Sequence, residues 1–350
     1  MKKTKLLAAL LLCTAVALPI KAYSAEQTFE GTYQGIDVPT QYGGAGYIPT
    51  GDSAIVKAGT QFINNTAING AGIYNYVGGN LTIEDSVRFD GNNAVGIILP
   101  DGRPNGGAGG AIQNFGTAVM GDNLIFENNT AKWGGAAIYA GSNSNGGHST
   151  TIGSGAIFRN NTLTDSASYG GAIFVEDDNN SENVIFTLGN NSTFENNSAM
   201  EGGSIYLKQG TIAATIGEGA TFNNNTATET GGAIFTRTDL SLNGATFSNN
   251  TATRVDGGAI YNEGATLNIA NSSFVGNKAG DWGGAIINGK GGNANITDSV
   301  FENNMATTGG AIGSYRSSNE TNVANSVFKA NTAETEAGAL WLGNKSTVAD

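Results

Sequence analysis

Few side chains in this sequence have the chemistry of a nucleophile, a general base or a metal ligand. Its 350 residues include one histidine, His148, and one cysteine, Cys13, and Asp177-Asp178 is the only adjacent pair of aspartates. Glycoside hydrolysis needs two carboxylates roughly 5–10 Å apart, and no Arg-x-Lys motif follows this pair to supply the cations of a lyase. His148 lies in an Asn-Gly-Gly-His-Ser-Thr context typical of a flexible loop. We therefore expect no enzyme, no metal and no cofactor, and keep a secreted carbohydrate-active lyase or glycoside hydrolase as the alternative.

The densest acidic patch is the segment 176–182, which reads Glu-Asp-Asp-Asn-Asn-Ser-Glu. Clustered carboxylate and amide oxygens can hold Ca²⁺, but the spacing matches no calcium loop and the Gly-Gly-x-Gly-x-Asp pattern is missing. A solvated loop is the favoured interpretation. Segment 96–106 is a second insertion, and both are secondary binding candidates because loops on rigid scaffolds often carry recognition.

Aromatic side chains form a column that could bind a ligand. They follow the Ile of a recurring Gly-Gly-Ala-Ile motif, and alternation in a strand places them on the face opposite that Ile. If Ile faces the core, a stripe of rings runs along the outside, suited to glycan stacking or protein contact. The alternative is that the rings only stack on one another. The predicted binding residues are Tyr74, Tyr139, Phe174, Tyr206, Phe235, Tyr261 and Trp341, and non-aromatic residues of the column are Gln113, Ile287 and Gly313.

The composition excludes several classes of partner. The chain has 53 Gly, 43 Asn and only 13% charged residues, and its 17 basic and 29 acidic side chains give a net charge of -12. Four of the lysines lie within residues 1–25, so without that segment 13 basic residues face 29 acidic ones, a net charge of -16. Such a surface repels phosphate backbones, and we expect no nucleic-acid partner.

The first 25 residues have the pattern of a signal peptide. Lys2, Lys3 and Lys5 precede the apolar run 6–20, and small residues stand near position 25 as a cleavage site requires. Cys13 lies inside the apolar run after Leu12, which disfavours lipid attachment. The pattern predicts export from a Gram-negative-type bacterium, to the cell surface, the outer membrane or the extracellular space.

The elements that position these residues come from a repeat that runs along the chain. A Phe is followed three residues later by Asn in ten copies, with successive Phe spacings of 27, 37, 32, 36, 28, 25, 27, 27 and 27 residues. A repeat at a fixed period is the signature of a solenoid. The ten Phe are Phe62, Phe89, Phe126, Phe158, Phe194, Phe222, Phe247, Phe274, Phe301 and Phe328, and the ten Asn are Asn65, Asn92, Asn129, Asn161, Asn197, Asn225, Asn250, Asn277, Asn304 and Asn331.

One copy shows the strands that each repeat predicts. Residues 245–247, 258–262 and 266–270 have strand patterns separated by turn residues. Three short strands per ~27 residues predict an all-β, right-handed parallel β-helix of the pectin-lyase type, with ten to eleven rungs. We expect the Phe to stack inward, the Asn to form a ladder of hydrogen bonds, and the Gly pair to supply positive φ or close approach at a corner.

Tandem Phe-x-x-Asn and Gly-Gly-Ala-Ile motifs behind an export signal resemble the repeats of polymorphic outer membrane proteins, best known from chlamydiae. The matched pairs cover about residues 60–342. The resemblance implies an autotransporter passenger, displayed on the cell surface and acting in adhesion through its repeats. Members typically carry an outer-membrane β-barrel, which this chain does not include.

These observations predict a domain plan and a function. Residues 1–25 are a signal peptide, 26–58 an N-terminal cap or first rung, and 59–350 the β-helix repeats, ending mid-rung as expected of a fragment of a longer product. The expected function is adhesion or recognition, with a host-cell protein or glycan receptor as partner. A structural spacer within a larger surface protein is a further alternative.

Overall fold

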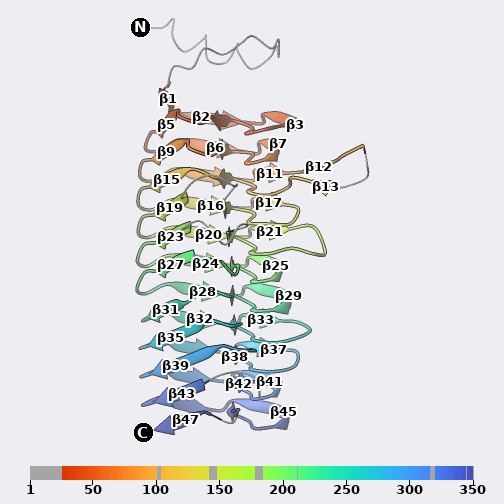
Figure 1. Cartoon of the computed structure of the whole chain (residues 1–350), viewed down its shortest axis with the longest axis vertical. Helices are drawn as coiled ribbons and strands as arrows, with labels where there is room; N and C mark the ends of the chain where they lie inside the picture. The colour runs from red at the N-terminus through yellow and green to blue at the C-terminus, as the bar shows by residue number, and fades with distance from the viewer. Residues whose placement is uncertain are drawn as a thin grey trace, which may run out of the picture.

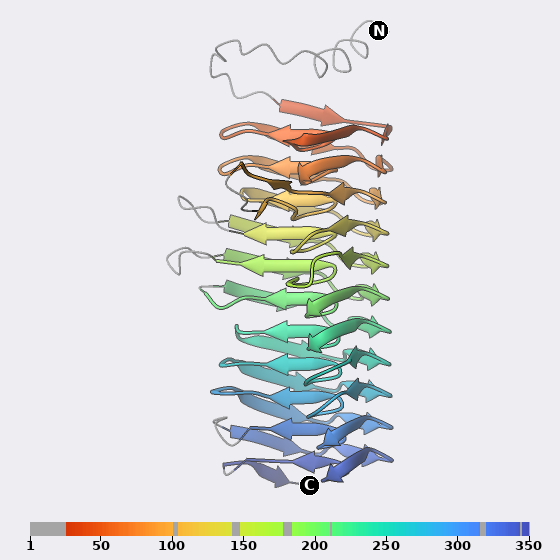
Figure 2. The same cartoon turned by 90° about the vertical axis from the view of Figure 1, so that its right-hand side faces the viewer.

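The computed structural model describes residues 26–100, 104–141, 148–177, 184–210, 212–315, 320–343 and 345–349. Over these ranges the chain is all-β and forms one parallel β-solenoid of about 11 turns (Figures 1 and 2). The described residues contain no helix that is long and apolar enough to cross a membrane. The predicted all-β solenoid with its ~27-residue period is confirmed.

Each full turn contributes four strands, one to each wall of the solenoid. Three walls are continuous sheets of 11 strands, whereas the fourth wall is divided into a seven-stranded and a five-stranded sheet. We name the three continuous walls the Phe sheet, the Thr sheet and the aromatic sheet.

The strands of the Phe sheet are β2 (Thr32–Gln34), β6 (Gln61–Ile63), β10 (Arg88–Asp90), β16 (Ile125–Glu127), β20 (Ile157–Arg159), β24 (Thr193–Glu195), β28 (Thr221–Asn223), β32 (Thr246–Ser248), β36 (Ser273–Val275), β40 (Val300–Glu302) and β44 (Val327–Lys329). Those of the Thr sheet are β3 (Asp37–Tyr42), β7 (Thr66–Asn69), β11 (Asn93–Ala94), β17 (Thr130–Ala131), β21 (Thr162–Leu163), β25 (Ser198–Glu201), β29 (Thr226–Thr230), β33 (Thr251–Ala252), β37 (Lys278–Ala279), β41 (Met305–Thr308) and β45 (Thr332–Glu336).

The strands of the aromatic sheet are β4 (Gly46–Ile48), β8 (Ile73–Asn75), β14 (Ile112–Asn114), β18 (Ile138–Gly141), β22 (Ile173–Glu176), β26 (Ile205–Leu207), β30 (Ile234–Thr236), β34 (Ile260–Asn262), β38 (Ile286–Asn288), β42 (Ile312–Ser314) and β46 (Leu340–Trp341). The seven-stranded sheet contains β1 (Glu26–Phe29), β5 (Ser53–Val56), β9 (Asn80–Ile83), β15 (Thr117–Met120), β19 (His148–Ile152), β23 (Val184–Leu188) and β27 (Ile212–Ile216). The five-stranded sheet contains β31 (Leu240–Asn243), β35 (Thr266–Ala270), β39 (Asn293–Thr297), β43 (Glu320–Ala324) and β47 (Thr347–Ala349).

The strand count per turn differs from the prediction of three. The segments predicted at 245–247, 258–262 and 266–270 correspond to β32, β34 and β35, and the Thr sheet adds β33 between the first two. Strand β33 has only two residues, so it is too short to show an alternating pattern in the sequence. Its parallel pairing with the turns on either side is what defines it as a strand.

A column of stacked phenylalanines fills the interior beneath the Phe sheet. From Phe62 to Phe328 each ring lies 4.6–5.0 Å from the next, measured between centroids, and nearly parallel to it. All of them except Phe328 are fully buried. The strand register sets this stacking, because each Phe pairs with the Phe of the neighbouring turn.

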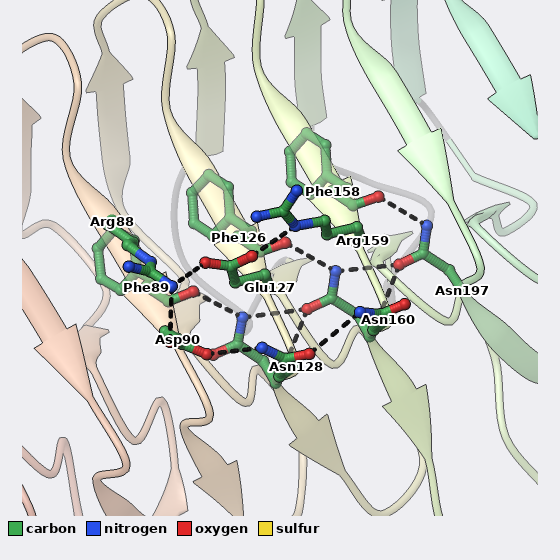
Figure 3. Close-up of polar contacts among 12 residues, drawn as sticks. Arg88, Phe89, Asp90, Phe126, Glu127, Asn128, Phe158, Arg159, Asn160 and Asn197 are labelled. Atoms are coloured by element: carbon green, nitrogen blue, oxygen red, sulfur yellow. Dashed lines mark hydrogen bonds and ion pairs between the residues drawn. The ribbon is translucent and has the colours of Figure 1, made fainter.

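A ladder of asparagine side chains lies beside this column at the next corner (Figure 3). The amide Nδ2 of Asn197 donates to the backbone carbonyl of Phe158 (2.9 Å) and to Oδ1 of Asn225 (3.0 Å). Its own Oδ1 accepts from the backbone N–H and from Nδ2 of Asn161, both at 3.0 Å. The same pattern continues from Asn65 to Asn331. Each buried amide therefore satisfies backbone groups that would otherwise lack partners.

The residue before each ladder asparagine adopts a left-handed backbone. Asparagine or glycine fills most of these positions, for example Asn303 at φ 56° and Gly276 at φ 66°, and both residue types tolerate this region. Ala330 is the exception, at φ 52°. Its Cβ is strained there by roughly 1–2 kcal/mol.

Replacing Ala330 by asparagine is therefore expected to raise the free energy of unfolding by about 1 kcal/mol. Asn303→Ala, at the equivalent position one turn earlier, should lower it by a similar amount. Urea denaturation followed by circular dichroism measures both changes. A stabilising effect of Asn303→Ala would contradict the strain argument.

The glycine pair marks the corner that leads into the aromatic sheet. Gly257 has φ 67°, a left-handed conformation. A Cβ on Gly258 would collide with the carbonyl oxygen of Gly284 in the next turn. The first glycine thus allows the left-handed backbone conformation, and the second lets the backbones of adjacent turns approach closely.

Candidate functional site

The aromatic column lies on the outer face of the aromatic sheet. Strand pairing aligns Tyr206 with Phe235 and Phe235 with Tyr261, while the neighbouring Ile205 and Ile234 face the interior with no exposed surface. Phe235 stacks between the other two rings, with centroids 4.6 and 4.9 Å away. The column forms an apolar cluster separate from the main core.

The rings lie on the face opposite the isoleucines, as strand alternation predicts, but most of them are covered. Only 2–9% of the surface of each of six residues is accessible, and Trp341 is half-buried. Their faces are therefore closed to a stacking ligand, and the predicted binding role of the column stays untested. The six are Tyr74, Tyr139, Phe174, Tyr206, Phe235 and Tyr261.

A second layer of aromatic residues covers the column. Trp133 lies edge-on to Tyr139 and Phe174, with centroids 5.5 and 5.7 Å apart, and its Nε1 donates to the carbonyl of Gly106 (3.0 Å). Tyr169 packs on Tyr206 with tilted rings, whose centroids are 5.0 Å apart. These covering residues lie in the segments between the Thr sheet and the aromatic sheet, where a single sequence shows no period that would place them over a neighbouring turn.

One end of the column stays accessible. Tyr47, on β4, pairs with Tyr74 on β8, and the two rings stack at 5.5 Å. Tyr42 also contacts Tyr74, at 5.1 Å, and Tyr42 and Tyr47 are each 40% exposed. Tyr76 adds a third, half-buried ring 6.4 Å from Tyr47. We call Tyr42, Tyr47 and Tyr76 the tyrosine cluster.

Sequence reasoning missed Tyr47 because the isoleucine of the repeated motif is a glycine, Gly46, in this turn. The segment Gly44-Ala45-Gly46-Tyr47 keeps the spacing of the motif, and this spacing is the signal that could have revealed it. A Cβ at Gly46 would lie 2.7 Å from the ring of Phe29, so a larger residue would require that ring to move.

A charged group lies at the edge of the column near its middle. The Arg237 guanidinium lies 5.0 Å from the centroid of Phe235, a cation–π contact. Its Nη1 donates to the hydroxyl of Tyr206 (3.0 Å) and its Nε donates to the Glu263 carboxylate (2.9 Å). Burial raises the pKa of Tyr206 above its usual range and also raises the pKa of Glu201 nearby. The Arg237 side chain is therefore bound by neighbouring residues of the fold.

A buried carboxyl group lies under the covering layer near the other end. Asp256 is 2% exposed, accepts the Trp282 backbone N–H at 2.9 Å through Oδ1, and accepts the Tyr315 hydroxyl through Oδ2. Burial raises the pKa of Asp256, and the Asp281 charge adds to that rise, while the two hydrogen bonds oppose it. Burial likewise raises the pKa of Tyr261 to about 12.

This carboxyl group predicts a pH dependence of stability. Because the pKa of Asp256 is higher in the folded than in the unfolded chain, its contribution is largest below the ordinary aspartate pKa. That contribution is lost as the pH rises through the raised pKa. Between about pH 4 and pH 7 the free energy of unfolding of the wild type should fall relative to that of Asp256→Asn. Denaturant titrations of both proteins at several pH values measure this; parallel pH profiles would contradict it.

An ion cluster occupies the outer face of the Phe sheet (Figure 3). Glu127 is only 3% exposed and pairs with Arg88 through one carboxylate oxygen and with Arg159 Nε, at 2.5 Å, through the other. Arg88 also contacts Asp90, at 2.9 Å. Two cations thus meet two anions on consecutive turns, so the charges of this patch compensate one another.

The residues singled out for chemistry lie at one corner of the solenoid in adjacent turns, because Gly141 pairs with Glu176 and His148 pairs with Val184. The interpretation of His148 as a flexible-loop residue is wrong, because it begins strand β19 and is 3% exposed. Its alternation with the buried residues of the strand turns it inward.

Residues 101–103, inside the insertion 96–106, lie outside the described part of the chain. The flanking strands β12 (Ile97–Ile98) and β13 (Pro104–Asn105) pair antiparallel.

The acidic segment is also only partly described. Glu176 ends strand β22, is 3% exposed and pairs with Lys208 Nζ at 2.7 Å, and Asp177 is 2% exposed. The solvated-loop interpretation is therefore wrong for these two residues. Asp178 and the rest of the segment lie outside the described residues, as do Cys13 and the predicted signal peptide. Within the described ranges no three His, Cys, Asp or Glu side chains come together as a metal site requires.

The Phe column and the Asn ladder define a parallel β-solenoid built from a single repeated turn. Residues 123–141, 191–208, 219–237 and 244–263 match the Chlamydia polymorphic membrane protein repeat. Each match runs from a strand of the Phe sheet to the following strand of the aromatic sheet. Four turns of the solenoid therefore match this chlamydial-type repeat, and the resemblance in the sequence is confirmed. Comparisons with curated proteins and with solved structures give no match.

Proposed function

We propose that this chain is a surface-displayed recognition module that attaches to a receptor, protein or glycan, on a host cell. The four matches to a polymorphic membrane protein repeat are the observation that carries the proposal. Because the matched repeat belongs to membrane proteins, the match supports display of this chain outside the cell. An exported chain would meet other cells there. The proposal includes export and attachment to the outer membrane.

The interior of the solenoid supports placing recognition on its outer surface. The Phe column and the Asn ladder are both buried, and the described residues show no cluster of metal-ligand type. The tyrosine cluster offers exposed rings stacked at one end of a buried column, and large, rigid aromatic side chains are favoured at binding surfaces. We propose this cluster as a contact surface for the receptor.

Replacing both Tyr42 and Tyr47 by alanine is expected to weaken attachment to cultured epithelial cells about fivefold or more. The chain is coupled to fluorescent beads, and bound beads per cell are counted. Val119→Ala is the matched control, because Val119 is 50% exposed on the seven-stranded sheet, away from the cluster. Both variants should keep the wild-type circular dichroism spectrum and melting temperature.

Full attachment by the double variant would remove the tyrosine cluster from the proposal. No attachment by the wild type would instead favour the spacer alternative. Release of reducing sugars from a polysaccharide by the wild type would favour the carbohydrate-active alternative.

A further inference from the structure

The fourth wall of the solenoid is interrupted between β27 and β31. Among the described strands, β27 pairs only with β23 and β31 pairs only with β35. The other three walls continue through the same two turns, since β28 pairs with β32, β29 with β33 and β30 with β34. We call the interruption the seam.

The seam coincides with a change in the corner that leads to the Phe sheet. In the seven-stranded sheet, the corner that follows each strand from β5 to β27 has four residues. The corner after β27, for example, is 217–220. In the five-stranded sheet, the corner that follows each strand from β31 to β43 has only two residues. The corner after β31, for example, is 244–245. Two residues of strand span about 6.6 Å, so strands β5 to β27 and strands β31 to β43 end at different distances from the Phe sheet.

Peptide groups face the seam from both sides. The carbonyl of Ile212 accepts the Thr238 hydroxyl (2.9 Å) and the carbonyl of Asn243 accepts the Gly219 N–H (3.2 Å), so both residues turn their peptide groups toward the seam. Because peptide groups alternate in direction along a strand, the peptide groups of Ala214 and Ser241, two residues from Ile212 and Asn243, also point toward the seam. No strand pairs with these edges in the described chain, which leaves polar backbone groups that favour a hydrogen-bonding ligand.

Two hollows follow the seam along the surface. One, of about 470 Å³, is lined by Thr215, Ser241 and Asn268 at its rim and by Ile216 and Leu242 at its base. The second, of about 600 Å³, is lined by Ala213, Thr238 and Asp239 among others. Both hollows are open to solvent on the outer face of this wall.

The base of the seam is apolar and shallow. Ala214 occupies the inward column that holds Phe186 in the preceding turn, and unlike Phe186 it is only half-buried. Asn268 and Asn295 form an exposed ladder beside it, with Asn295 Nδ2 donating to Asn268 Oδ1 at 2.9 Å. Amide and hydroxyl groups at the rim can donate and accept, while the base offers apolar contact.

We infer that the seam is a binding site for a neutral oligosaccharide. Sugar hydroxyls match the mixed donors and acceptors of the rim and strand edges, and the C–H faces of the rings match the apolar base. The exposed carboxylate of Asp239 and a net charge of -12 disfavour anionic sugars. Arg237, the cation of the second hollow, is engaged by Glu263.

An inserted peptide strand fits the seam less well. A strand inserted between β27 and β31 would separate two turns by about 9.6 Å, twice the normal strand spacing. The three continuous walls keep these turns one strand apart. The inference goes beyond cell attachment, because a soluble sugar would bind at the seam whether or not the chain is displayed.

The purified full chain is titrated with lactose, N-acetyllactosamine and maltotriose, with sialyllactose as the anionic comparison, and binding is followed by isothermal calorimetry. We expect at least one neutral sugar to bind with a Kd at or below about 1 mM. Thr215→Arg, at the seam, should weaken that binding tenfold or more. Thr151→Arg is the matched control in the same outward column two turns away, and it should leave binding unchanged.

Three outcomes would overturn the inference: no binding of any neutral sugar up to about 10 mM, preference for sialyllactose, or equal losses in the two arginine variants. Melting temperatures establish that both variants are folded. The cell-attachment assay with the tyrosine variants is independent of this result, so failure of the seam and failure of the proposed function are distinguishable.

Discussion

Phe247→Ala is expected to lower the free energy of unfolding by about 3–5 kcal/mol. Phe247 is fully buried and stacks between Phe222 and Phe274, with ring centroids 4.6 and 4.8 Å away. Alanine removes the ring from both stacks and leaves a cavity that β32, paired on both sides, cannot close by moving inward. Denaturation in guanidinium chloride, followed by circular dichroism, measures the loss.

Phe328→Ala is the matched control. Phe328 belongs to the same column but is half-buried and stacks only on Phe301, at 4.9 Å. Its replacement should cost about 1–2 kcal/mol, because less apolar surface returns to water. Each turn of a solenoid contacts only its neighbours, so Phe247→Ala should also separate the unfolding of the two halves. Equal losses for the two variants would show that the column contributes little beyond local burial.

Asn225→Ala is expected to cost about 3 kcal/mol, because it breaks the buried ladder at its centre. Asn225 Nδ2 donates to Oδ1 of Asn250 and to the carbonyl of Phe194, both at 3.0 Å. Its Oδ1 accepts from the backbone N–H and Nδ2 of Asn197, again at 3.0 Å. Alanine leaves the two donors of Asn197 and the carbonyl of Phe194 without these partners inside the protein. The same denaturant titration measures the effect.

Asn268→Ala tests whether burial is the cause. Asn268 belongs to the exposed ladder of the five-stranded sheet, where Asn295 donates to it at 2.9 Å. Water can replace its hydrogen bonds, so the expected change is within about 0.5 kcal/mol. A loss at Asn268 as large as that at Asn225 would contradict the argument that desolvation sets the cost.

Much of the fold was predictable because the period of the repeat is also the length of one turn. The spacing between Phe247 and Phe274 is 27 residues, and the two residues pair directly in the Phe sheet. A residue type that recurs once per turn must form a column along the axis. Local patterns also located β34 and β35, but the two residues of β33 were too few to show a pattern.

The candidate surface was less predictable because it depends on contacts between turns. Alternation placed Tyr206 opposite Ile205, but burial depends on Tyr169, which reaches it from the preceding turn. His148 stands among glycines and serines in the sequence, yet pairing with Val184 makes it part of a strand. In both cases the deciding partner is more than 30 residues away in the chain.

The sequence by itself determined the repeat, the parallel strands and the residues of the inner columns, because these follow from one residue type at one period. Only the tertiary structure decided which outer surfaces are accessible. The covering layer buries the aromatic column except near Tyr42 and Tyr47 at one end and at the half-buried Trp341 at the other. The seam opens where β27 and β31 fail to pair. Accessibility is a property of neighbouring turns together, so no single repeat encodes it.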